Sequence, residues 1–204
     1  MAFDTSPVLQ GRRILVARRA TDARGLPFYG FKLLNAPPIL RPDFLFIGFQ
    51  PSGGSDAYAH ELALGTDRRW PDEPEFATAD WHLAKRMQEV FPRDALMRSM
   101  GSNVVFLRWP SVRGYRRSVP SDLRDEVEAF SRRTLCEITD IVEPQEVVTI
   151  GFKSLDGDAT PDLVSAVIRT LALRFGRWVF VDAWVKRNLT RKLPSLIGLL
   201  LVVD

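Results

Sequence analysis

The alternation of short apolar segments with longer amphipathic ones is the feature that most constrains how this chain can fold. The short segments are rich in β-branched or aromatic residues and comprise Phe44–Phe49, Asn103–Trp109, Glu146–Ile150 and Arg177–Val181. Such segments are typical of strands buried on both faces of a parallel sheet. Their alternation with helices predicts an α/β fold: a three-layer α/β/α sandwich with a mostly parallel, four-stranded central sheet and right-handed crossovers.

The intervals between the strands carry helical patterns. From Phe76 to Phe91 the apolar residues keep helical spacing. The next helix is expected to begin with Ser121 as its N-cap and to stop before Pro144. A third helix is predicted over 160–175, with Thr160 as N-cap, Pro161 in the first turn and Gly176 at its C-terminal end.

Length and composition favour one domain over residues 1–204, because 204 residues at 46% hydrophobic can bury one sizeable core. Residues 1–40 are expected to form an irregular N-terminal extension, in which Arg13–Ala17 could be an edge strand. The apolar end, Leu196–Val203, could be a short helix or a last buried strand, and periodicity does not separate the two.

Cysteine content and hydropathy bear on the compartment. Cys136 is the one cysteine, which excludes an internal disulfide and a cluster held by several thiolates of this chain. Because Cys136 falls in a helical stripe, we expect a small core residue. No apolar stretch approaches the roughly 18 to 20 residues of a membrane span, and no basic-then-apolar leader opens the chain. A cytoplasmic protein without membrane contact is therefore expected.

In a parallel sheet, ligands bind beyond the carboxyl ends of the strands. The expected loops there are Gln50–Gly54, Pro110–Arg117, Gly151–Ser154 and Asp182–Asn188. The first, "GFQPSGG", exposes backbone N–H groups that can cradle an anion or let a base approach the main chain. No Gly-Lys-Ser/Thr ending follows, and the spacing is not a dinucleotide fingerprint, so both nucleotide-binding classes are excluded.

Basic residues gather on these loops. The net charge is only +3, but 23 of the 28 basic residues are arginines, whose guanidinium groups grip phosphate oxygens. Those on or near the loops are Arg108, Arg113, Arg116, Arg117, Lys153, Lys186, Arg187, Arg191 and Lys192. Interleaved with Trp109, Tyr115 and Trp184, they suit a nucleic-acid strand. The alternative is an ordinary solvated rim, with the arginines reflecting codon bias.

The order of these segments resembles the uracil-DNA glycosylase superfamily over roughly residues 43–188. "GFQPSGG" is similar to the family's first motif at Gly48 and Pro51. The run "SNVVFLRWPS" resembles "TNVVKCRPP" of the iron–sulfur branch, matching at Asn103, Val104, Val105, Arg108 and Pro110. "IVEPQEVVTIGFKSL" looks like the family's third strand, matching at Pro144, Val147, Val148 and Gly151. The chain departs from the family in the last loop, where "DAWVKRN" replaces His-Pro-Ser and only Arg187 and Asn188 match a variant, and in lacking the cluster cysteines.

The resemblance implies a DNA glycosylase that flips a uracil or another altered base out of DNA and excises it with water. The catalytic positions would be Gln50, which can orient water but cannot take a proton, and Asn103, whose amide could read the base edge. The substrate-binding residues would be Gly48, Phe49, Pro51, Ser52, Gly53 and Phe76. The DNA-binding residues would be Arg108, Ser111, Arg113, Tyr115, Arg116, Arg117, Lys186, Arg187 and Asn188. Single- or double-stranded DNA would be the partner.

Structural alternatives stand beside these roles. Asn103 could bond nearby backbone, Phe76 and Tyr58 could be core or surface aromatics, and His60 and His82 are expected to be structural. Asp156 and Asp158 suit a turn better than a cation site, so we expect no metal and no cofactor.

Two other functional classes stay open: a nucleic-acid-binding protein with weak or no catalysis on the same fold, and a small-molecule enzyme that uses Ser52 or Ser111. The sequence leaves the oligomeric state undetermined, although a monomer is favoured.

Overall fold

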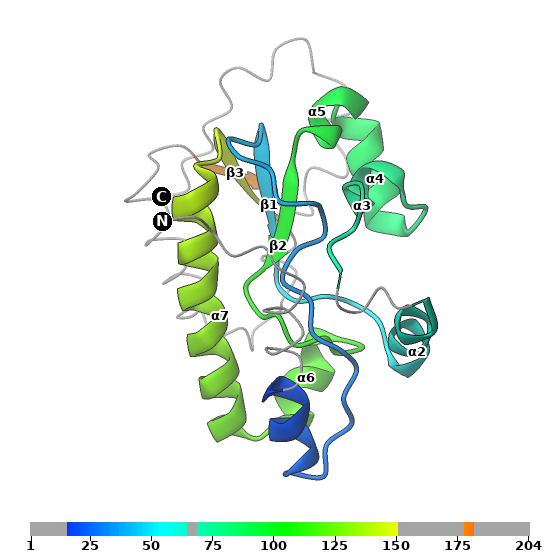
Figure 1. Cartoon of the computed structure of the whole chain (residues 1–204), viewed down its shortest axis with the longest axis vertical. Coiled ribbons are helices and arrows are strands. Elements are labelled where there is room, and N and C mark those ends of the chain that lie inside the picture. Colours follow the sequence, from blue (N-terminus) through cyan, green and yellow to red (C-terminus); the bar gives the residue numbers. More distant parts are fainter. Residues whose placement is uncertain (1–15, 65–68, 151–177, 182–204) are drawn as a thin grey trace.

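The computed structural model describes residues 16–64, 69–150 and the backbone of 178–181. Its strands are β1 (Phe44–Gly48), β2 (Met100–Asn103), β3 (Glu146–Ile150) and β4 (Trp178–Val181). They pair in the order β2-β1-β3-β4, and each described pairing is parallel (Figure 1). The predictions of an α/β class and a parallel sheet are therefore confirmed.

Helices cover both faces of this sheet (Figure 1). The described helices are 16–22, α2 (Ser55–Leu64), α3 (Glu75–Thr78), α4 (His82–Val90), α5 (Arg93–Met97), α6 (Val112–Ser118) and α7 (Ser121–Val142). Because successive strand residues point to opposite faces, Leu45 and Ile47 pack with α7, whereas Phe46 packs with α3, α4 and α5. The apolar runs of β1 and β3 are thus buried on both sides.

The second strand differs from its prediction. It covers Met100–Asn103, not Asn103–Trp109. The apolar run beyond Asn103 is buried but leaves the sheet, and it pairs with the N-terminal region through the antiparallel bridge Phe31↔Leu107. The small and polar residues of β2, Gly101 and Ser102, are required by the residues packed against them. A Cβ at Gly101 would lie 2.8 Å from the Phe76 ring, and Ser102 Oγ donates to Leu33 O at 2.8 Å.

Two helix predictions also need correction. The expected helix over 76–91 is divided into α3 and α4, because Ala79 and Trp81 are extended. Gln88 Nε2 donates to the Phe76 and Ala79 carbonyl oxygens, which compensates for the interruption. Ser121 is not an N-cap: it is the first residue of α7, and Pro120 precedes it without a side-chain cap.

The C-terminal end of α7 lies where it was predicted, just before Pro144, with Glu143 in the left-handed region at φ 49°. A proline lacks the N–H that another helical turn needs. The N-terminal prediction is wrong in part, because residues 16–22 form a helix and not an irregular or edge-strand segment. The helix expected over 160–175 and the apolar end at 196–203 lie outside the described residues.

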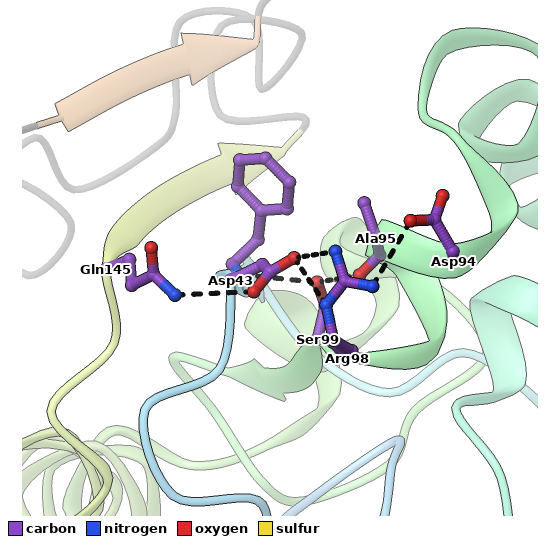
Figure 2. A network of polar contacts seen from close by, with 7 residues as sticks. Asp43, Asp94, Ala95, Arg98, Ser99 and Gln145 are labelled. Atoms are coloured by element: carbon purple, nitrogen blue, oxygen red, sulfur yellow. Dashed lines mark hydrogen bonds and ion pairs between the residues drawn. The ribbon is translucent and has the colours of Figure 1, made fainter.

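A polar network joins the amino ends of three strands (Figure 2). Arg98 donates to Asp43 Oδ2 from Nε at 3.0 Å and from Nη2 at 2.7 Å, and to Asp94 Oδ2 at 3.2 Å. Gln145 Nε2 donates to Asp43 Oδ1 at 3.3 Å. Since Asp43, Arg98 and Gln145 precede β1, β2 and β3, this network orders the sheet at the end opposite the candidate site.

Over the described ranges, no helix combines the length and apolar character of a membrane span.

Candidate functional site

The carboxyl ends of β1 and β2 bring a glycine and an asparagine together. Gly48 and Asn103 are partners in the parallel ladder. A Cβ at position 48 would lie 2.8 Å from Asn103 Oδ1, so the glycine leaves room for the amide to lie against β1. Asn103 is 4% exposed, yet its Nδ2 has no hydrogen-bond partner among the described residues. A buried amide donor of this kind is costly unless something outside the chain satisfies it.

Gln50 lies two residues beyond Gly48, in the loop that follows β1. Its Nε2 donates to Trp109 O at 3.0 Å, which fixes the amide against the segment that follows β2. Its Oε1 is buried and has no hydrogen-bond partner within the part of the chain that the structure describes. We call Gly48, Gln50 and Asn103 the amide edge. It presents one unpartnered donor and one unpartnered acceptor beside neighbouring strand ends.

A charged group adjoins the amide edge under the loop Pro51–Gly54. Arg108 is 3% exposed, and its Nη2 donates to Glu61 Oε1 of α2 at 2.7 Å. Its Nε and Nη1 are buried and have no partner in the ranges 16–64 and 69–150. Lys32 Nζ lies 3.9 Å from Glu61 Oε1 and forms an ion pair with Glu75. We call Lys32, Glu61, Glu75 and Arg108 the arginine cluster.

The glycines of this loop permit its close approach to the arginine cluster. Gly53 has φ +117°, a conformation that L side chains rarely adopt. A Cβ there would also lie 3.4 Å from Arg108 Cδ. The loop therefore lies directly on the aliphatic part of Arg108, and any side chain at position 53 would strain the backbone.

The predicted residues have different surroundings. Gly48, Gln50, Asn103 and Gly53 lie at or next to the amide edge, and Ser52 is exposed on the same loop. Pro51 is buried. Phe49 packs with Val105 and Tyr115, and Phe76 packs edge-on against Phe46 with ring centroids 5.0 Å apart. The described packing thus makes both phenylalanines core residues, in agreement with the structural alternative for Phe76.

The predicted basic rim is only partly correct. Arg108, Trp109 and Tyr115 are buried, so their expected place on an exposed rim is wrong. The expected loop Pro110–Arg117 also contains helix α6, whose N-cap Ser111 accepts from Gly114 N at 3.0 Å. A short apolar–basic run is ambiguous in sequence, and here the long-range contacts with Glu61 and Phe49 decide its burial.

The remaining arginines of this segment lie on α6 at the lower end of the molecule (Figure 1). Arg113 and Arg117 are exposed. Arg116 is half-buried, and its guanidinium carbon lies 5.4 Å from the centroid of the Phe49 ring. The other predicted DNA-binding positions, Lys186, Arg187 and Asn188, lie outside the described residues.

Tyr115 of α6 and Glu128 of α7 form a polar pair, in which Tyr115 is buried and Glu128 is half-buried. Tyr115 Oη donates to Glu128 Oε1 at 3.5 Å. Burial is the main cause that raises the pKa of the Tyr115 hydroxyl, and the Glu128 charge adds to it. Burial also raises the pKa of the Glu128 carboxyl, against the opposing effect of Arg124. Neither group faces the amide edge in any described contact, so we assign this pair a structural role.

Sequence reasoning missed three members of the arginine cluster: Lys32, Glu61 and Glu75. They come from the N-terminal segment, α2 and α3, and no local spacing links them to Arg108. The available signal was Arg108 itself, which stands in an apolar run. A charge inside a buried segment requires a partner, so an acidic residue could have been expected beside it. The two histidines, His60 and His82, are exposed on α2 and α4.

Metal binding and similarity to known proteins add no further assignment. Within 16–64 and 69–150, no group of three His, Cys, Asp or Glu side chains is arranged to hold a metal ion. Neither protein-family models nor curated proteins gave a match to the chain.

Proposed function

We propose that this protein is a DNA glycosylase that admits a flipped-out uracil or another altered base at the amide edge and excises it with water. The proposed scaffold is the three-layer α/β/α sandwich with a four-stranded sheet, and the proposed location is the cytoplasm, which the single cysteine supports. One observation carries the proposal: Asn103 Nδ2 and Gln50 Oε1 are buried, unpartnered and placed at adjacent strand ends.

The chemistry of these amides suits a planar base. An amide N–H of Asn103 can donate to a carbonyl oxygen of the base, and a pyrimidine imide offers such an oxygen. Gln50 Oε1 can accept from a water molecule and so orient it. Flipping a base costs a few kcal/mol, and the exposed arginines of α6 would offset part of this cost through phosphate contacts.

The proposed step needs no strong base. As the C1′–N bond breaks, its electron pair leaves with the base, and the sugar acquires cationic character. Water oriented by Gln50 then adds to C1′, and its proton passes to the departing base or to solvent. Hydrogen-bond donation from Asn103 stabilises the negative charge that develops on the base, which is the type of electrostatic contribution that commonly dominates catalysis.

An excision assay tests this proposal. The purified protein is incubated with single- and double-stranded oligonucleotides that each carry one altered base, and abasic sites are then cleaved with alkali. We expect product with at least one base, and a rate lowered by roughly 10²-fold or more in Asn103→Asp, because the donor is replaced by an acceptor. Gln145→Ala, which removes an exposed amide at the opposite end of the sheet, is the matched control and should retain the rate.

No cleavage across the panel would refute excision. A second candidate would then apply: a nucleic-acid-binding protein that holds a flipped base without cutting. The neutral Gln50 side chain, which cannot take a proton, favours this candidate. It predicts salt-dependent affinity for the oligonucleotides that weakens in Asn103→Asp but not in Gln145→Ala, with no product in either case.

A further inference from the structure

The arginine cluster contains a buried cation whose hydrogen-bonding capacity is only partly used. Arg108 is 3% exposed, and only Nη2 has a described partner, Glu61. Nε and Nη1 have none. A guanidinium group prefers charge-assisted bonds to oxygens, so two unpartnered nitrogens beside a loop indicate a place for a further anionic oxygen.

The loop above Arg108 adds backbone donors. It ends at Gly54, and α2 begins at Ser55 and runs for 10 residues. The first N–H groups of a helix have no intrahelical acceptor and favour negative charge. A Cβ at Gly53 would lie 3.4 Å from Arg108 Cδ and 3.9 Å from Arg108 Nε, so the loop that leads into α2 passes close to the buried guanidinium.

The charges of the arginine cluster are balanced, so an added anion could replace Glu61 as the partner of Arg108. Lys32 and Arg108 face Glu61 and Glu75, so the described charges cancel. Asp56 lies in the first turn of α2, where its negative charge already interacts favourably with the positive end of the helix dipole. An arriving anion therefore competes with Glu61 for the guanidinium, and loss of the Glu61 charge should strengthen its binding.

We propose that Arg108 and the loop Pro51–Gly54 form a binding site for a phosphoryl group. The backbone N–H groups at the start of α2 and the unpartnered guanidinium nitrogens would supply its donors. This site does not require base excision, because it uses none of the residues of the amide edge. The phosphoryl group can belong to a free nucleotide or to a nucleic-acid backbone, since both present the same oxygens.

Binding of inorganic phosphate is the direct test, measured by calorimetry at constant ionic strength with chloride as the reference anion. Arg108→Lys keeps the charge opposite Glu61 but removes Nε and Nη1, so phosphate affinity should fall roughly tenfold or more. Glu61→Gln removes the competing charge and should raise the affinity. The matched control, Arg117→Lys, changes an exposed arginine of α6 and should leave the affinity unchanged.

The outcomes separate this proposal from its rivals. Absence of phosphate binding in the wild-type protein, or equal losses in Arg108→Lys and Arg117→Lys, overturns it. If Arg108→Lys does not fold, as judged by circular dichroism, Glu61→Gln decides alone: unchanged or weaker affinity overturns the proposal. A nucleoside monophosphate and an oligonucleotide without terminal phosphates, titrated in parallel, identify the source of the phosphoryl group. Phosphate binding without excision would leave this site standing and remove only the glycosylase proposal.

Discussion

Glu128 shows how the burial of a single carboxyl group makes the free energy of unfolding depend on pH. Burial raises its pKa in the folded protein, so the folded state binds a proton more tightly than the unfolded chain. Its contribution is therefore most favourable below the unfolded carboxyl pKa of about 4.3 and is lost as pH rises through the folded pKa. We expect Glu128→Gln to raise the free energy of unfolding at neutral pH, with the gain disappearing in acid.

Urea titrations over a pH series check this expectation. Glu137→Gln, an exposed carboxylate on the same helix, is the control and should change stability by no more than about 0.5 kcal/mol at any pH. A Glu128→Gln variant less stable than wild type at neutral pH would show that the bond to Tyr115 outweighs the cost of burial.

Gly48 provides a second test at the residue scale. Its backbone φ is not positive, so alanine there adds no backbone strain, but the new Cβ would meet Asn103 Oδ1 at 2.8 Å. The Asn103 amide must then move. We expect Gly48→Ala to lose base excision or base-dependent binding as fully as Asn103→Asp, and to cost about 1–3 kcal/mol of stability. Gln145→Ala, at the opposite end of the sheet, is the control and should retain excision or binding.

At the scale of an element, the end of α7 carries a strained residue. Glu143 adopts φ 49° after the last turn, where glycine is favoured, and its ion pair with Arg41 at 3.5 Å is exposed. We expect Glu143→Gly to raise the free energy of unfolding by roughly 1 kcal/mol. The same change inside the helix, Glu137→Gly, should lower it by about 1 kcal/mol. Chemical denaturation measures both, and equal signs would contradict the explanation.

At the scale of the whole molecule, the sheet lies between two described core clusters, one packed against α7 and the other against α3, α4 and α5. Leu45 is 0% exposed and packs towards α7, so Leu45→Ala should cost about 2–5 kcal/mol. Leu40→Ala, at a leucine that is 73% exposed, should cost about 0.5 kcal/mol or less.

If both core clusters unfold together, as we propose for a single domain, circular dichroism and tryptophan fluorescence will give one coincident transition.

The two ends of the sheet also differ in what their polar groups do. At the amino ends, Asp43, Arg98 and Gln145 satisfy one another (Figure 2). At the carboxyl ends, Gln50, Asn103 and Arg108 keep unpartnered atoms. A polar group that is buried and unpartnered costs stability, so its presence at the ligand-binding end of a parallel sheet supports a functional role there.

Local pattern alone identified β1, β3 and the span of α7, since continuous apolar runs mark doubly buried strands and a long stripe marks one helical face. It also placed Gln50 in the loop after β1, but it put Asn103 at the start of the second strand, whereas Asn103 is the last residue of β2. It missed β2, because Gly101 and Ser102 are small only to accommodate Phe76 and Leu33 from distant segments.

Tertiary structure alone decided which charges are buried. Arg108 and Arg117 look alike along the chain, yet one faces Glu61 beneath a glycine loop and the other faces solvent. Sequence thus determined the α/β class and the positions of β1, β3 and α7, because hydrophobic periodicity is a local property. The partners of each polar group depend on contacts between segments tens of residues apart, which no local pattern encodes.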